Sequence, residues 1–277
     1  MGLRISTNVP SVNAQRTMGG TTRDLQKSLA QLSSGSRITK AADDAAGLSI
    51  SETLKSTIRG YGQAQRNAND AISLVQIAEG GLNEISSITT RLRELAVQAA
   101  SDTVGDVERG FIDKEVQQLK NEAERISQVT RFGSNHLLNG QGQGFDFQVD
   151  INNDDFNDRI SFQPSDINAT TAFLGLDGFD FSDKNSAREA LGVLEEAQRT
   201  VNGHRATLGA IQNRLVSTTE NLGVAIENFS AANSRIRDAD IAQSSSELAR
   251  NSVLQQASIG VLAQANTIPG SALRLLQ

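Results

Sequence analysis

The sequence contains no cysteine and no tryptophan, a single tyrosine and three prolines. The lack of cysteine excludes disulfide bonds, thiolate chemistry and cysteine-ligated metals, so folding does not depend on the redox state of the compartment. Aromatic residues make up 4% of the chain, a composition that favours long helices over a β-sandwich. Because the prolines stand at positions 10, 164 and 269, two very long segments contain no residue that would break a helix.

Charge is spread unevenly along the chain, whose net charge is −6. Residues 1–40 carry six Lys and Arg against the single Asp24, whereas residues 145–183 carry nine Asp against the single Arg159. Basic and aromatic residues do not interleave in any stripe, so nucleic-acid binding is not expected. No stretch holds 18 consecutive apolar residues, and the N-terminus has neither an apolar signal region nor a cleavage site. We therefore expect no membrane insertion, and any export must use a route that reads no cleaved signal peptide.

Two proline-free segments carry long seams of apolar or small residues with a helical period. The first predicts a helix over about 44–100, because such residues recur in alternating steps of three and four. Its seam positions are Ile50, Leu54, Thr57, Tyr61, Ala64, Ala68, Ala71, Val75, Ala78, Leu82, Ile85, Thr89, Leu92, Ala96 and Ala99. A second helix is predicted at about 104–130. A strict seven-residue repeat predicts a third helix and a left-handed supercoil where it packs against other helices. The repeat positions are Ala187, Leu194, Val201, Leu208, Leu215, Leu222, Phe229 and Ile236.

Each end of the chain has a shorter amphipathic segment outside these seams. After Pro10, one face carries Met18, Leu25, Leu29 and Leu32. Near the C-terminus a helix is predicted to end before Pro269, and its apolar positions are Ile241, Leu248, Leu254, Ala257, Val261, Leu262 and Ala265. A short helix of this kind buries little by itself, so each terminal segment needs a partner.

A compact β region interrupts the helical pattern. The stretch FDFQVDI, 145–151, alternates apolar and polar residues, and RISF, 159–162, does so again after a turn-rich segment. We predict one β-hairpin region at about 140–183. The fold class is then mainly α: a rod of long helices in a coiled-coil bundle over 44–237, with one small hairpin region.

Two adjacent carboxylates, Asp43 and Asp44, stand where the first long helix should begin. No histidine, lysine or further acid is placed in register with them, so we interpret both as helix caps that satisfy free backbone N–H groups. Gly35 and Ser36 are expected to end the preceding helix. The two histidines, His136 and His204, belong to no HExxH motif, and no GxSxG elbow occurs. We expect no enzymatic activity, no cofactor and no metal.

Several further elements resemble bacterial flagellins over nearly the whole length of the chain. These elements are LSSGSRITKAADDAAGLSI (32–50), QAQRNANDAISLVQIAEGGLNEI (63–85), RLRELAVQAAS (91–101), LGAIQNRL (208–215), SRIRDADIA (234–242) and LQQASIGVLAQANTIPGSALRLLQ (254–277). The variable outer domains that flagellins usually insert after the hairpin are missing. The sequence is therefore identified as a minimal member of that family.

The resemblance implies a structural subunit that polymerises into the extracellular flagellar filament and is exported unfolded by the flagellar type III route. It implies a discontinuous inner core, residues 1–43 and 238–277, whose terminal helices pair as a coiled coil and order on assembly. From the amphipathic pattern we expect the terminal helices to pack through Leu25, Leu29, Leu32, Leu248, Leu254, Val261 and Leu262. Partners implied are other copies of the chain, the flagellar cap, junction proteins and an export chaperone. A hook-filament junction protein is the alternative; a protease-bearing flagellin would need an HExxH insertion that this chain lacks.

The RELAV element also matches the surface that the flagellin-sensing Toll-like receptor binds in this family. The match carries over to Arg91, Leu95 and Glu115. Leu95 is expected to lie off the main seam of the long helix. The alternative interpretation of Arg91, Arg93 and Glu94 is an exposed face held by ion pairs.

Overall fold

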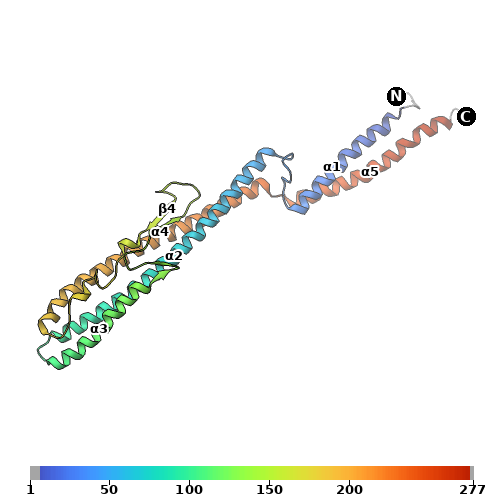
Figure 1. The fold of residues 1–277 in the computed structure, drawn as a ribbon. Coiled ribbons are helices and arrows are strands. Elements are labelled where there is room, and N and C mark those ends of the chain that lie inside the picture. Colours follow the sequence, from blue (N-terminus) through green and yellow to red (C-terminus); the bar gives the residue numbers. More distant parts are fainter. Residues whose placement is uncertain (1–6, 275–277) are drawn as a thin grey trace. The chain divides into compact units, whose positions relative to one another are not determined.

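A computed structural model describes residues 7–274, which are mainly helical (Figure 1). The helices are α1 (Val9–Ser34), α2 (Ala45–Ala99), α3 (Asp106–Val129), α4 (Lys184–Arg237) and α5 (Ile241–Arg274). The strands are β1 (Arg131–Phe132), β2 (Asn135–His136), β3 (Phe145–Gln148) and β4 (Arg159–Phe162), and 3-10 turns lie at Pro164–Asp166 and Leu176–Gly178. The described residues divide into two compact units: residues 57–227, and residues 7–56 together with 228–274.

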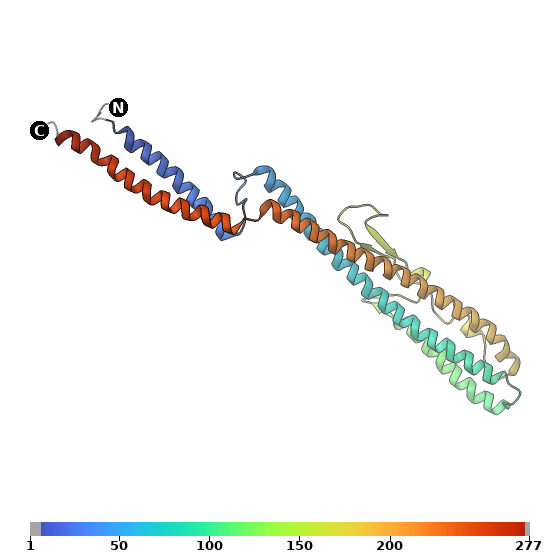
Figure 2. The same ribbon diagram turned by 180° about the vertical axis from the view of Figure 1, so that it is seen from behind.

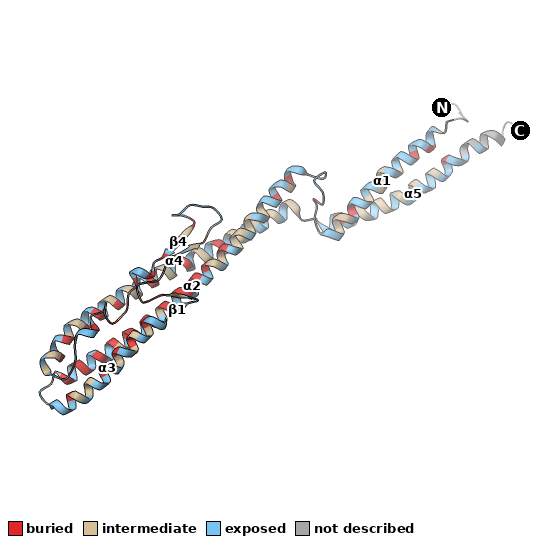
Figure 3. Cartoon of the chain, in the orientation of Figure 1, coloured by how far each residue is buried: buried red, intermediate tan, exposed pale blue. Residues whose placement is uncertain are grey.

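The unit formed by residues 57–227 is built on α2, α3 and α4, which run side by side (Figures 1 and 2). Every predicted seam position of α2 from Ala64 to Ala99 is buried. The heptad positions of α4 from Ala187 to Leu222 are buried as well, which confirms both seams along this unit. Buried residues follow the inner faces of these helices in Figure 3. The predicted long-helix bundle is therefore present.

The first turns of α2 depart from the predicted seam. Ile50, a predicted seam position, is 53% exposed, whereas its neighbour Ser51 is fully buried. The Ser51 hydroxyl donates a hydrogen bond of 2.7 Å to Oδ1 of Asn233 on α4. A buried hydroxyl needs a polar partner, which Asn233 supplies, so the serine and not the isoleucine faces α4 here.

Arg109 joins the end of α2 to the beginning of α3. Its guanidinium donates to the carbonyls of Ala99 and Ser101, both at 2.9 Å, and to the carboxylate of Asp106 at 2.8 Å. The last carbonyls of a helix have no partner within the helix, so a buried arginine is well suited to cap them. This contact holds the α2–α3 turn in place.

The predicted β-hairpin forms from β3 and β4, which pair in antiparallel register from Phe145 opposite Phe162 to Gln148 opposite Arg159. The hairpin contacts α2, where Nδ2 of Asn67 donates to the carbonyl of Gln148 at 3.0 Å. A second two-residue ladder pairs β1 with β2. The hairpin therefore belongs to the same packed unit as the long helices.

In the other unit, α1 and α5 lie against each other. Gly35 ends α1 in the left-handed conformation, with φ of 66°, as predicted. The prediction that the last helix stops before Pro269 is wrong, because α5 continues to Arg274. A side chain from the N-terminal end, Asn8, binds the carbonyl of Ala265, which the proline leaves without its helical donor. None of the helices, over the residues described, is long and apolar enough to cross a bilayer.

Adjacent glycines of α2 give a matched test of the packing in the three-helix unit. A Cβ added at Gly81 would lie 2.7 Å from both Leu138 and Thr130, whereas a Cβ at Gly80 would meet nothing within 4 Å. We expect Gly81→Ala to lower the free energy of unfolding by about 1–3 kcal/mol, because overpacking forces a buried neighbour to move. Gly80→Ala should raise it by up to about 1 kcal/mol through helix propensity. Urea unfolding followed by circular dichroism measures both; equal effects would contradict the packing.

Candidate assembly surfaces

Small side chains fill the interior of the α1–α5 pair. Among the residues of the two helices whose burial the structure describes, the buried ones are Ser11, Ala14, Ser28, Ser244 and Ala265. The spacing of two packed helices depends on the side chains at the contact, so small residues allow a close approach. They also bury little apolar area, and the contribution of the pair to stability is correspondingly modest.

Eight large apolar side chains of the pair are exposed. Those exposed to between 47% and 65% are Val9, Val12, Leu29, Ile241, Val253, Leu254, Ile259 and Val261. We call these eight residues the outward apolar set. Soluble monomers rarely expose large apolar patches, and such patches mark interaction sites. Both helices therefore offer apolar side chains to another molecule.

The seven packing positions expected for the terminal helices divide between these two environments. Four are half-buried in the pair: Leu25, Leu32, Leu248 and Leu262. Three belong to the outward apolar set: Leu29, Leu254 and Val261. The sequence pattern placed all seven on amphipathic faces and did not separate the two groups.

Backbone pairing joins the segment after α1 to the segment after α4. The N–H of Arg37 donates to the carbonyl of Arg237 at 2.6 Å, and the N–H of Ala239 donates to the carbonyl of Gly35 at 2.9 Å. Ile38, beside this pairing, is 1% exposed. The sequence analysis predicted neither the backbone pairing nor the burial of Ile38. One isoleucine in a turn-rich stretch gives no periodic pattern from which its burial could be predicted. The connection is thus an ordered part of its unit.

Asp44 caps α2, as predicted. Its Oδ1 accepts a hydrogen bond of 2.8 Å from the N–H of Gly47. This bond satisfies one of the free N–H groups in the first turn of a helix. The carboxylate therefore has a structural role at the start of α2.

Asp43 does not cap α2, which corrects the expectation that both acids do so. Its Oδ2 accepts from the Thr39 hydroxyl at 2.9 Å and from the N–H groups of Thr39 and Lys40 at 3.2 and 3.1 Å, and its Oδ1 pairs with Lys27 at 3.2 Å. The hydrogen bond from the Thr39 hydroxyl, followed by those from Lys27 and the two backbone groups, outweighs burial and lowers the pKa of Asp43 from 3.8 to about 2. One carboxylate thus closes the turn before α2 and ties it to α1.

Arg91 and Glu115 form an exposed ion pair between α2 and α3. Nη2 of Arg91 lies 2.9 Å from Oε1 of Glu115, and Nη1 lies 3.0 Å from Oε2 of Glu94. Leu95 lies off the predicted seam, as expected, but it is 2% exposed and packs in the core. The helix α2 packs against two other helices and therefore buries a wider stripe than one seam. Of the three expected receptor contacts, the structure leaves Arg91 and Glu115 on the surface.

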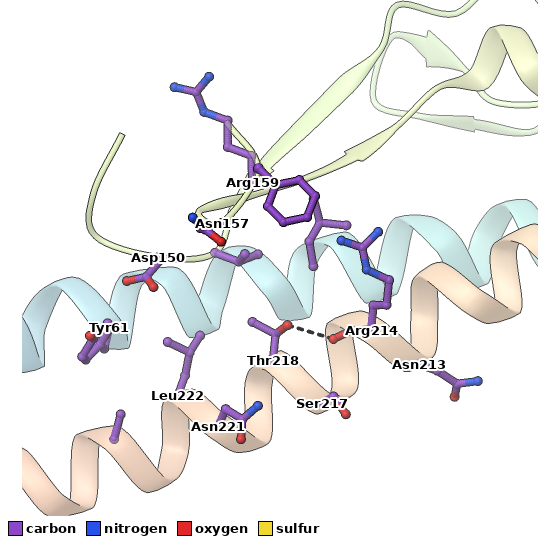
Figure 4. A pocket seen from close by; sticks show the side chains of 14 residues that line it. Tyr61, Asp150, Asn157, Arg159, Asn213, Arg214, Ser217, Thr218, Asn221 and Leu222 are labelled. Carbon is purple, nitrogen blue, oxygen red and sulfur yellow. Dashed lines mark hydrogen bonds between the residues drawn. The ribbon is translucent and has the colours of Figure 1, made fainter. Parts of the chain in front are cut away.

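A cavity of about 630 Å³ lies between the β3–β4 hairpin and α4, within the unit of residues 57–227 (Figure 4). Its lining includes Tyr61, Asp150, Arg159 and Arg214. The guanidinium of Arg159 pairs with Asp155 outside the lining and points away from the cavity. The charge of Arg159 is therefore directed away from the interior of the cavity.

The two histidines lie in separate structural contacts. Nδ1 of His136 is 2.7 Å from the carbonyl of Gln128, and Nε2 of His204 is 3.2 Å from the carbonyl of Asn168. Burial lowers the pKa of His204. No three His, Cys, Asp or Glu side chains converge as metal ligands between residues 7 and 274.

Two family models match most of the chain. Residues 5–143 match the bacterial flagellin N-terminal helical region, and residues 191–276 match the bacterial flagellin C-terminal helical region. The chain belongs to the bacterial flagellin family. The N-terminal match includes α1, α2 and α3, and the C-terminal match covers most of α4 and α5.

Relatives of this flagellin align over its whole length. It is 42% identical over 273 residues to a flagellin of Halalkalibacterium halodurans, 40% identical over 288 residues to a flagellar filament core protein of Brachyspira hyodysenteriae, and 37% identical over 304 residues to a flagellin of Bacillus subtilis. Each alignment covers 99% of this chain and at least 99% of the relative. The short form, without large outer domains, is therefore shared with these relatives.

A solved structure supports the same fold. The crystal structure of Bacillus cereus flagellin aligns with a TM-score of 0.51 at 31% identity, over 57% of this chain and 88% of that chain. The mainly helical fold with a small hairpin is thus confirmed for this flagellin.

The lowered pKa of Asp43 predicts an acid-sensitive turn. A carboxylate with a lower pKa in the folded state adds stability above its unfolded value of 3.8, and that stability is lost as the pH falls toward 2. At pH 6 we expect Asp43→Asn to weaken amide-exchange protection at Thr39 and Lys40 about fivefold, equivalent to about 1 kcal/mol after allowance for solvent screening. At pH 2 the difference should largely vanish. Asp70→Asn, at an exposed position of α2, is the control; a D43N defect that persists at pH 2 would contradict the assignment.

Proposed function

We propose that this flagellin is a structural subunit that polymerises into the flagellar filament. The observation that carries the proposal is the outward apolar set, because these eight large apolar side chains of α1 and α5 are exposed. A surface of that kind is costly in a lone soluble chain and useful when neighbouring copies cover it. Repeated heterologous contacts between copies then generate an open helical polymer.

Under this proposal the terminal segments, residues 1–43 and 238–277, make the inner core, and residues 44–237 make the helical rod. Leu25, Leu32, Leu248 and Leu262 pack within one chain, while the remaining expected positions, Leu29, Leu254 and Val261, contact neighbouring copies. The small interior of α1–α5 supports this division, since it stabilises one chain weakly. Ordering the ends between copies would couple folding to assembly.

A hook-filament junction protein is the alternative function. The relatives aligned over nearly full length are named flagellins or flagellar filament core proteins, which favours the filament. The proposed role is structural and assigns no catalytic residue.

Export by the flagellar type III route, without a cleaved signal peptide, follows as part of the same proposal, and so does an extracellular location in the filament. A chain without cysteine can be delivered unfolded and fold outside the cell without forming disulfides. The flagellar cap, the junction proteins and an export chaperone are the further proposed partners.

Val261 and Gln264 give a matched test of the filament proposal, because both are exposed on α5 and only the first is apolar. We expect Val261→Glu to slow elongation of short filament seeds about tenfold or more, since a neighbouring copy would bury an unpaired charge. Gln264→Glu adds the same charge at a polar position and should elongate seeds within about twofold of the wild type. Electron microscopy of seed length against time measures all three chains.

Two results of that experiment would count against the proposal. Equal elongation by the two variants would remove Val261 from the contact between copies. A wild-type chain that stays folded and leaves the seeds unextended would overturn the filament function itself.

We further propose that the exposed pair Arg91–Glu115 contacts the flagellin-sensing Toll-like receptor. The pair bridges α2 and α3, so its charges are held in a fixed position on the surface. Leu95, buried beneath it, would support this surface without touching the receptor.

Charge reversal separates the receptor contact from a general loss of positive charge. Arg91→Glu should reduce signalling in receptor-reporter cells about tenfold, because the new carboxylate repels Glu115 and also repels a receptor surface that is complementary to the positive charge of Arg91. Arg93→Glu, an equal change at an exposed neighbour, is the control and should signal like the wild type. The exposed ion pair contributes less than about 1 kcal/mol, so both variants should remain folded. Unchanged signalling by R91E would reject the contact.

A further inference from the structure

The helix α5 continues through a proline. Residue 269 lies within α5, which ends at Arg274. In an α-helix the N–H of residue 269 would donate to the carbonyl of Ala265, but proline has no N–H and its ring displaces that carbonyl. Both the missing bond and the displaced carbonyl weaken an isolated helix at this point. Something else must therefore satisfy Ala265 for the last turn to remain helical.

The side-chain amide of Asn8 provides that partner. Its Nδ2 donates a hydrogen bond of 2.9 Å to the carbonyl of Ala265, which is 5% exposed. Its Oδ1 accepts from the N–H of Ser11 at 3.2 Å and so caps the beginning of α1. One amide therefore completes the hydrogen bonding of two helix ends that lie 257 residues apart in sequence.

A second bond next to this contact strengthens it. The buried hydroxyl of Ser11 donates to Oδ1 of Asn266 at 2.8 Å. The contact joins consecutive residues of α5 to one turn of α1, so sliding either helix by a residue would break both bonds. The small side chains elsewhere in the pair offer few interlocking shapes, whereas buried polar contacts are known to fix helix register.

We propose that Asn8 is a positioning residue that couples the start of α1 to the end of α5. Without Asn8 the last turn of α5, after Pro269, loses stability. Without α5 the first turn of α1 keeps its cap and loses its contact with the other helix. The helical state of residues 270–274 thus depends on α1 being in place and in register. Pro269 makes α5 unable to form its last turn alone.

A double-mutant cycle between positions 8 and 269 tests the coupling. Asn8→Ser keeps a neutral capping oxygen, which suits the first position of a helix as well as asparagine does, but it loses the Nδ2 donor. Pro269→Ala restores the N–H that the Ala265 carbonyl lacks. We would measure amide hydrogen exchange of residues 270–274 by mass spectrometry in the wild type, both single variants and the double variant. Each chain is studied free and after growth on filament seeds.

In the wild-type background we expect Asn8→Ser to speed exchange of these amides about fivefold, the effect of one hydrogen bond. In the Pro269→Ala background the same substitution should change exchange by less than about twofold, because the helix supplies its own donor. An equal effect in both backgrounds would overturn the coupling. So would wild-type amides that exchange as in an unfolded chain in both the free and the filament state.

Discussion

Two packed helices can bury their large apolar side chains between them or leave them for other partners. In this flagellin, α1 and α5 do both: serine, alanine and four half-buried leucines lie within the pair, and eight valine, leucine and isoleucine side chains are exposed. A chain built this way gains little from pairing its own ends and much from contact with its neighbours. The rod needs no such help, because its three helices bury continuous seams within one chain. The three-helix unit thus provides most of the stability of the single chain, and the unit with α1 and α5 provides the apolar surface for association.

The ends of the long helices are held by side chains from elsewhere in the sequence. Arg109 of α3 caps the last carbonyls of α2, and Asn8 completes both the start of α1 and the end of α5. Asp43 closes the turn before α2 while pairing with Lys27 of α1. A helix end has backbone groups that its own ladder cannot satisfy. These contacts therefore define where each helix stops and which segment lies next to it.

Periodicity predicted the long helices and the hairpin because each depends on many residues that repeat, and the resemblance of several sequence elements indicated the family. The misplaced residues are those whose position depends on a single partner. Ser51 replaces Ile50 in the interior because Asn233 lies opposite, and Leu95 is buried because a second helix covers α2. A one-dimensional pattern contains no information about such partners. The outward apolar set was likewise invisible, since amphipathic spacing does not say which of two apolar stripes faces the other terminal helix.

Tyr61 is the single tyrosine of a chain without tryptophan, and it lines the cavity beneath the β3–β4 hairpin. Burial, together with the nearby charges of Asp150 and Asp158, raises its pKa above the usual 10. Ultraviolet emission from the folded protein therefore originates almost entirely at one point of the rod. The fluorescence of Tyr61 is therefore a built-in optical probe. It reports on how the hairpin packs against the long helices and gives no signal from the terminal helices.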